Sequence, residues 1–100
     1  MEDLIYVDVP GKFIGRASFA VRVTGDSLEP IYFDGDILLV EAAAHLNHGD
    51  LGIFSVSREW KVRRYYEKDG VRKLVSLNVD IPNEPISHRV RCKGRVLGKI

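Results

Sequence analysis

The residues that decide the fold run from position 19 to position 40 and read FAVRVTGDSLEPIYFDGDILLV. In the first six of them, alternate side chains form one apolar face and one mixed face, which is typical of a half-buried strand. Gly25 and Asp26 end this alternation. Asp34-Gly35-Asp36 then makes a turn before Ile37–Val40, an apolar run that suits a strand buried on both faces. The stretch predicts two strands joined by a loop.

Downstream, two hairpins and a terminal strand are predicted. Leu51–Val56 and Trp60–Tyr66 are strands joined by a turn at Ser57–Glu59, and Asp69-Gly70 leads into a strand at Leu74–Leu77. We also expect one helical turn within Glu41–Leu46. In the tail, apolar positions alternate with a basic face at Arg89, Arg91, Lys93, Arg95 and Lys99. The fold is therefore predicted to be mostly β, a compact arrangement of short antiparallel strands.

The composition is that of one ordinary globular domain. The 100 residues are 45% hydrophobic and 29% charged, which is enough for a modest core. The net charge is +1, so any DNA is expected to bind to another domain. The single cysteine, Cys92, excludes an internal disulfide. No apolar run approaches the about 20 residues that span a bilayer, so we expect a cytoplasmic protein with no membrane partner.

Ser27 is the candidate nucleophile. It follows a strand in a loop that Gly25 tightens and Pro30 closes, and such a loop can expose a hydroxyl together with the backbone N–H groups of an oxyanion hole. The neighbouring residues Gly25, Asp26 and Leu28 would form that hole. Gly-Asp-Ser is also a common turn sequence, so the alternative is a serine that caps its own loop.

The order of motifs resembles that of a known family. GDSLEP is followed by DGDILLV, GDLGIF, the basic strand WKVRRYY and LVSLN. This order resembles the C-terminal, serine-protease-fold domain of LexA-like and phage repressors, which has a compact LexA/signal-peptidase-like β fold. The resemblance assigns residues 19–100 to a repressor C-terminal peptidase-like dimerisation domain, and leaves residues 1–18 as the remnant of a linker or a first strand.

The resemblance implies a Ser/Lys site. In this family the serine of the motif is the nucleophile and a lysine on the later strand is its general base. Ser27 takes the first role, but Arg63 stands at the position of the base, and arginine stays protonated in proteins. Lys61 shares the strand face of Arg63, roughly 6 to 7 Å away along the chain, and would replace the base only if the strand shifts or bulges. We expect Arg63 to bond a carboxylate or backbone carbonyls.

Other chemistry is not favoured by the sequence. His45, His48 and His88 lie in predicted loops with no spacing that suggests a triad, so they are expected at the surface. His45-x-x-His48 with Asp50 could suggest a metal site, but too few further ligands lie close in sequence. Asp26, Asp34 and Asp36 are expected to hold turns. No metal or other cofactor is predicted.

The partners are implied by the resemblance. These domains dimerise through their C-terminal parts, so Arg91, Lys93 and Arg95 are predicted at a homodimer interface, on an edge strand that pairs with a second copy. DNA would be bound by a helix-turn-helix domain outside this chain, and a recombinase filament would act as co-protease. The Ala-Gly or Cys-Gly bond that self-cleaving members cut does not occur here. Only 26 residues precede Ser27, too few for a DNA-binding domain, so we expect an excised domain or a cleavage product.

Three functions stay open at this point. The first is a regulatory dimerisation domain of a prophage or SOS-type transcriptional repressor, with a degraded or displaced catalytic base. The second is an active self-cleaving serine peptidase that uses Ser27 and Lys61. The third is a processing enzyme related to signal peptidases. Whether Lys61 or Arg63 faces Ser27 separates the first from the second.

Overall fold

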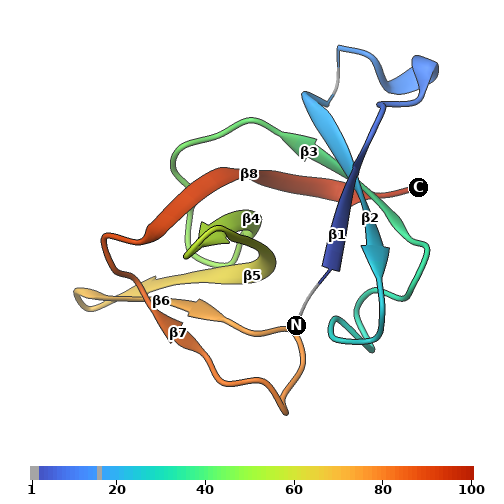
Figure 1. Ribbon diagram of the computed structural model, residues 1–100. Helices are drawn as coiled ribbons and strands as arrows, with labels where there is room; N and C mark the ends of the chain where they lie inside the picture. Colours follow the sequence, from blue (N-terminus) through green and yellow to red (C-terminus); the bar gives the residue numbers. More distant parts are fainter. Residues whose placement is uncertain (1–2, 16) are drawn as a thin grey trace.

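The computed structural model describes residues 3–15 and 17–100 (Figure 1). Its described strands form one antiparallel sheet in the order β1-β2-β3-β8-β4-β5-β6-β7, and a single 3-10 turn, η1 (Gly11–Phe13), follows β1. The strands are β1 (Asp3–Val7), β2 (Phe19–Thr24), β3 (Ile37–Glu41), β4 (Leu51–Val56), β5 (Glu59–Lys68), β6 (Val71–Val75), β7 (Glu84–Pro85) and β8 (Val90–Lys99). The prediction of a mostly β fold of short antiparallel strands is confirmed.

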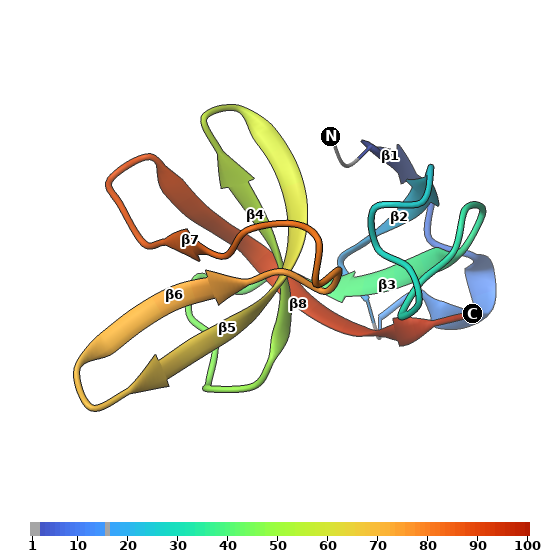
Figure 2. The ribbon, with the colours of Figure 1, turned by 90° about the horizontal axis from the view of Figure 1, so that it is seen from below.

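The sheet is folded into two halves (Figure 2). β1, β2 and β3 form one half, β4 to β7 form the other, and the long β8 runs through both. Two buried clusters follow from this arrangement. The first core joins the halves and contains Val21, Val23, Leu28, Tyr32, Leu38, Val40, Ile53 and Val62. The second core lies within the half that β4 to β7 form with the first part of β8, called the β4–β8 half below. It contains Phe54, Tyr65 and Leu74.

The β4–β5 hairpin is buried on both of its faces. Ile53 and Val62 pair with one another and belong to the first core, whereas Phe54 and Tyr65 belong to the second. Because side chains alternate across a strand, successive residues must serve opposite cores. This explains why β4 is almost uniformly apolar instead of alternating with polar residues.

Both predicted hairpin turns are present. Ser57 and Arg58 have φ angles of 50° and 73°, and Asp69 and Gly70 have 52° and 77°. Positive φ at both central residues is the backbone of a type I′ turn, whose twist matches that of the strands it joins. The first turn is shorter than predicted, because Glu59 already pairs with Val56.

Two local predictions are wrong. The helical turn at Glu41–Leu46 is absent, because Glu41 ends β3 and an irregular loop follows it. Side chains satisfy the amides of this loop: Ala42 donates to Ser18 Oγ at 2.9 Å and Asn47 to Asp50 Oδ2 at 2.9 Å. The strand predicted at Leu74–Leu77 begins earlier, at Val71, because the two-residue turn puts Val71 directly opposite Lys68.

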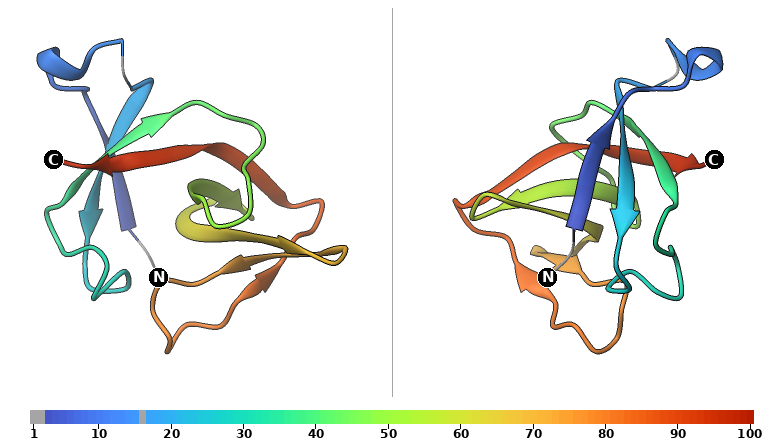
Figure 3. Two further views of the ribbon diagram at one scale, coloured as in Figure 1. Left: turned by 180° about the vertical axis from the view of Figure 1, so that it is seen from behind. Right: turned by 45° about the vertical axis from the view of Figure 1, so that its right-hand side comes forward.

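The terminal strand differs from its prediction in position and in regularity (Figure 3). β8 lies between β3 and β4 in the sheet order, so it is not an edge strand. Its alternation is interrupted where the pairing registers shift opposite Leu39/Val40 and Ile53/Phe54. β8 passes close to β3 at Gly94, where only a glycine fits, since a Cβ there would lie 2.6 Å from the carbonyl oxygen of Glu41.

Candidate functional site

The turn that carries Ser27 directly follows β2. Ser27 is half-buried, and the next residue, Leu28, is 1% exposed and part of the first core. The Leu28 carbonyl accepts hydrogen bonds from the amides of Ile31 and Tyr32, both at 3.0 Å. Leu28 therefore anchors the turn and leaves Ser27 at its rim.

The rest of the loop is held by aspartates, as predicted for Asp34 and Asp36. Gly25, at φ 83°, donates its amide to Asp34 Oδ1 at 2.8 Å, and Phe33 donates its amide to Asp36 Oδ2 at 2.8 Å. The Phe33 amide, helped by Lys99, holds the pKa of Asp36 below its usual value. The Gly25 amide is thus used by the loop, whereas the amides of residues 26–28 donate no hydrogen bond to the part of the chain that the structure describes.

Lys61 and Arg63 lie on β5, on either side of Val62. Lys61 pairs with Phe54 and Arg63 with Gly52, and the β4–β5 register is continuous from Leu51 to Val56. Lys61 is half-buried, whereas Arg63 is 2% exposed and donates from Nη1 to the Val62 carbonyl at 2.9 Å. The expected bond from Arg63 to a backbone carbonyl is present.

The structure brings the serine turn and this strand to the same core. Leu28, next to Ser27, and Val62, between the two cations, are both members of the first core. By strand alternation the side chains of Lys61 and Arg63 leave β5 on the face opposite Val62, the face that also carries Tyr65 of the second core. The shared core therefore brings the two backbone segments together, and by itself directs neither cation toward Ser27. The roles of Ser27, Lys61 and Arg63 stay predictions.

The predicted interface residues lie on β8. Arg95 is half-buried and forms ion pairs with Glu41 at 2.8 Å and Asp50 at 3.2 Å. Arg91 donates to the His88 carbonyl at 2.6 Å, and Lys93 lies where the register shifts. Arg95 thus joins β3, β8 and the start of β4 within one chain, and an interface role for these residues remains a prediction.

The histidines are exposed, as predicted. His48 has a structural role that the sequence did not indicate: its Nδ1 accepts a hydrogen bond from the Glu67 amide at 3.1 Å, and its ring contacts Tyr66 edge-on.

Among residues 3–15 and 17–100, no cluster of three metal-ligating side chains is present. The same residues contain no helix long and apolar enough to cross a membrane.

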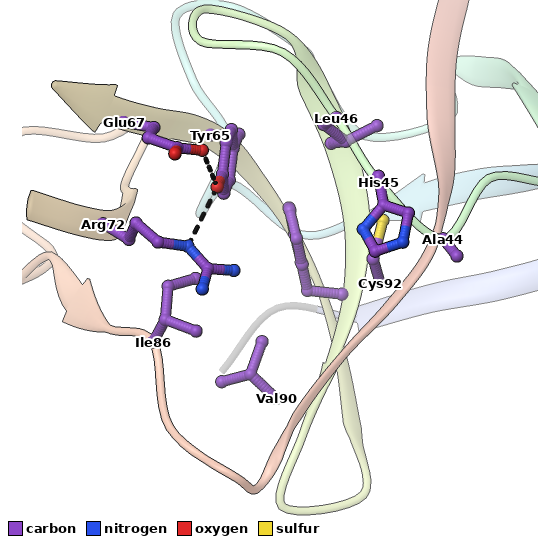
Figure 4. A pocket seen from close by; sticks show the side chains of 10 residues that line it. Ala44, His45, Leu46, Tyr65, Glu67, Arg72, Ile86, Val90 and Cys92 are labelled. Atoms are coloured by element: carbon purple, nitrogen blue, oxygen red, sulfur yellow. Dashed lines mark hydrogen bonds between the residues drawn. The ribbon is translucent and has the colours of Figure 1, made fainter. Parts of the chain in front are cut away.

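Sequence reasoning missed a cavity of about 430 Å³ in the β4–β8 half (Figure 4). It is lined by Ala44, His45, Leu46, Phe54, Tyr65, Glu67, Arg72, Ile86, Val90 and Cys92. These residues come from the 42–50 loop, from four strands and from the segment after β7, so no contiguous motif marks them. The one available signal is that Tyr65, Glu67 and Arg72 flank a predicted hairpin.

Comparison with known proteins agrees with this architecture. The Peptidase S24-like family matches residues 2–98. A LexA repressor of Syntrophomonas wolfei is 31% identical over 93% of this chain, and one of Thermotoga petrophila is 26% identical over 93%. The chain covers 46% and 49% of these two relatives, about half their length. It belongs to the Peptidase S24-like family, as a LexA-like domain with a serine-peptidase-type fold.

Proposed function

We propose that this chain is the C-terminal regulatory and dimerisation domain of a LexA-like or prophage transcriptional repressor, and that Arg63 has silenced self-cleavage at Ser27. A helix-turn-helix domain outside this chain would bind DNA, and the domain described here would pair two repressors. The similarity to LexA repressors over 93% of the chain supports the regulatory role.

The proposed loss of self-cleavage rests on one observation: Arg63 is buried at the position where the family has its lysine general base. A Ser/Lys site works because burial lowers the pKa of lysine until its neutral amine accepts the hydroxyl proton. Arginine at 2% exposure has no comparable neutral form near neutral pH. The continuous β4–β5 register supports an ungapped match of Arg63, and not Lys61, to the base.

The test is to restore the base. Arg63→Lys in the full-length repressor, incubated at neutral and alkaline pH, should yield two fragments by intact-mass spectrometry, with more cleavage at high pH because more lysine is neutral. The wild type should stay whole, and so should Arg63→Lys combined with Ser27→Ala. Fragments from the wild type that disappear with Ser27→Ala would overturn the silencing.

The second candidate is an active peptidase in which Lys61 is the base. Its support is that Lys61 is half-buried and on the strand face of Arg63. In that case the wild type cleaves itself at alkaline pH, alone or with an activated recombinase filament, and Lys61→Met abolishes cleavage. Nothing in the described residues favours the signal-peptidase alternative.

A further inference from the structure

The cavity of the β4–β8 half has an apolar body. Phe54, Ile86 and Val90 all contribute to its wall and belong to or pack against the second core. Leu46 reaches the cavity from the 42–50 loop, which Arg95 holds to the sheet through Asp50. A volume of about 430 Å³ is in the range of small-molecule sites.

One end of the cavity is polar. Tyr65 donates its hydroxyl to Glu67 Oε1 at 2.5 Å and accepts Arg72 Nε at 3.1 Å. The acceptor Glu67 raises the pKa of Tyr65, with burial as the second cause. The three side chains thus form a chain of two hydrogen bonds, in which the Tyr65 hydroxyl lies between the carboxylate of Glu67 and the guanidinium of Arg72.

Arg72 presents the end of its guanidinium to the cavity. Figure 4 shows Tyr65, Glu67 and Arg72 on one side and His45, Leu46 and Cys92 on the other, with the terminal nitrogens of Arg72 directed inward. Only Nε of Arg72 has a hydrogen bond to the described part of the chain. The two terminal nitrogens form a planar fork that matches both oxygens of a carboxylate.

We infer that this cavity binds a small monocarboxylate with an aliphatic body. Its carboxylate would accept two hydrogen bonds from the terminal nitrogens of Arg72, and its chain would lie against Phe54, Ile86 and Val90. A single guanidinium suits a single negative charge, and the Glu67 carboxylate beside it disfavours a polyanion such as a nucleotide. Neither Ser27 nor β3 lines this cavity, so ligand binding there can be tested independently of the repressor's self-cleavage.

Cys92 offers a direct probe of occupancy. It is the single cysteine, it lines the cavity, and burial raises the pKa of its thiol, so its uncatalysed reaction is slow. We would measure its rate with the uncharged reagent 4,4′-dithiodipyridine at rising decanoate, below the micelle concentration. If the occupied site does not react, a decanoate concentration about ten times the Kd should slow the reaction about tenfold, because about 90% of the sites are then occupied.

The headgroup and Arg72 are tested in the same assay. Decyltrimethylammonium, with the same chain and the opposite charge, should protect Cys92 far less. Arg72→Gln should raise the decanoate Kd several-fold, because it removes the positive charge and the paired donors of the guanidinium, and Arg72→Lys should raise it less because the charge is kept. Arg22→Gln, on the exposed face of β2, makes the same charge change outside the cavity and should leave the Kd unchanged.

A second measurement locates the ligand without any variant. In ¹H–¹⁵N spectra of the wild type, decanoate should shift amides around Leu46, Phe54 and Val90 and leave the Ser27 turn unchanged. Absence of saturable protection, equal protection by the cationic amphiphile, equal losses for Arg72→Gln and Arg22→Gln, or shifts centred on Ser27 would each overturn the proposal.

Discussion

The Ser27 turn and the cavity beside Arg72 lie against opposite cores of one β4–β5 hairpin, and they are built in different ways. The serine turn is anchored by Leu28 in the larger first core and by hydrogen bonds within its own loop. The cavity is bounded by a loop and several strands around a smaller core. One face of the hairpin is packed to support a turn, whereas the other leaves space. We therefore expect the serine side to be more sensitive to lost side-chain volume.

The largest expected effect tests this contrast in packing. Leu28→Ala removes a side chain that is 1% exposed, so the free energy of unfolding should fall by about 3 kcal/mol. Leu46→Ala, at the half-buried wall of the cavity, should lower the free energy of unfolding by less than about 1.5 kcal/mol, because a half-exposed side chain loses less buried apolar area. Urea unfolding measures both losses. Equal losses would break the comparison.

The next largest loss of stability is expected at Gly94, where β8 passes from one half of the sheet to the other. Gly94→Ala would place a Cβ 2.6 Å from both the Glu41 carbonyl oxygen and Val40 Cγ1, so β8 would have to move, at a cost of about 2 kcal/mol. Gly11→Ala is the matched control, because its Cβ would meet no atom within 4 Å. Thermal unfolding followed by circular dichroism should show a clear loss for the first variant only. An unchanged midpoint for Gly94→Ala would contradict the close approach of β3 and β8.

The smallest effect is a change in how stability depends on pH. The Asn47 amide, followed by Arg95, lowers the pKa of Asp50 from its ordinary value near 3.8. A lowered folded-state pKa adds stability above the unfolded-state pKa, and this stability is lost as the pH falls through the folded-state pKa. Asp50→Asn should therefore lower the unfolding midpoint at pH 6 and flatten its decline below pH 4. A variant with the wild-type acid profile would show that Asp50 does not stabilise the cavity loop.

Much of the fold was predictable because its signals are local. The strand at Phe19–Thr24, the hairpin turns and the aspartate-held loop each follow from a few adjacent residues. The helical turn at Glu41–Leu46 failed as a prediction because the loop's amides bond to Ser18 and Asp50, and Ser18 lies far away in sequence. The interior place of β8 was missed because alternation indicates which side of a strand is buried, and not which strands flank it.

The sequence by itself determined the β class, the family and the identity of the candidate residues Ser27 and Arg63, since strand periodicity, turn chemistry and an ordered set of motifs are written along the chain. Only the tertiary structure decided that Leu28 and Val62 share one core, that Arg63 is buried, and that Tyr65, Arg72 and Cys92 surround one cavity. The physical reason is that burial and cavity shape depend on contacts between segments far apart in sequence. Those contacts arise when β8 pairs with both β3 and β4.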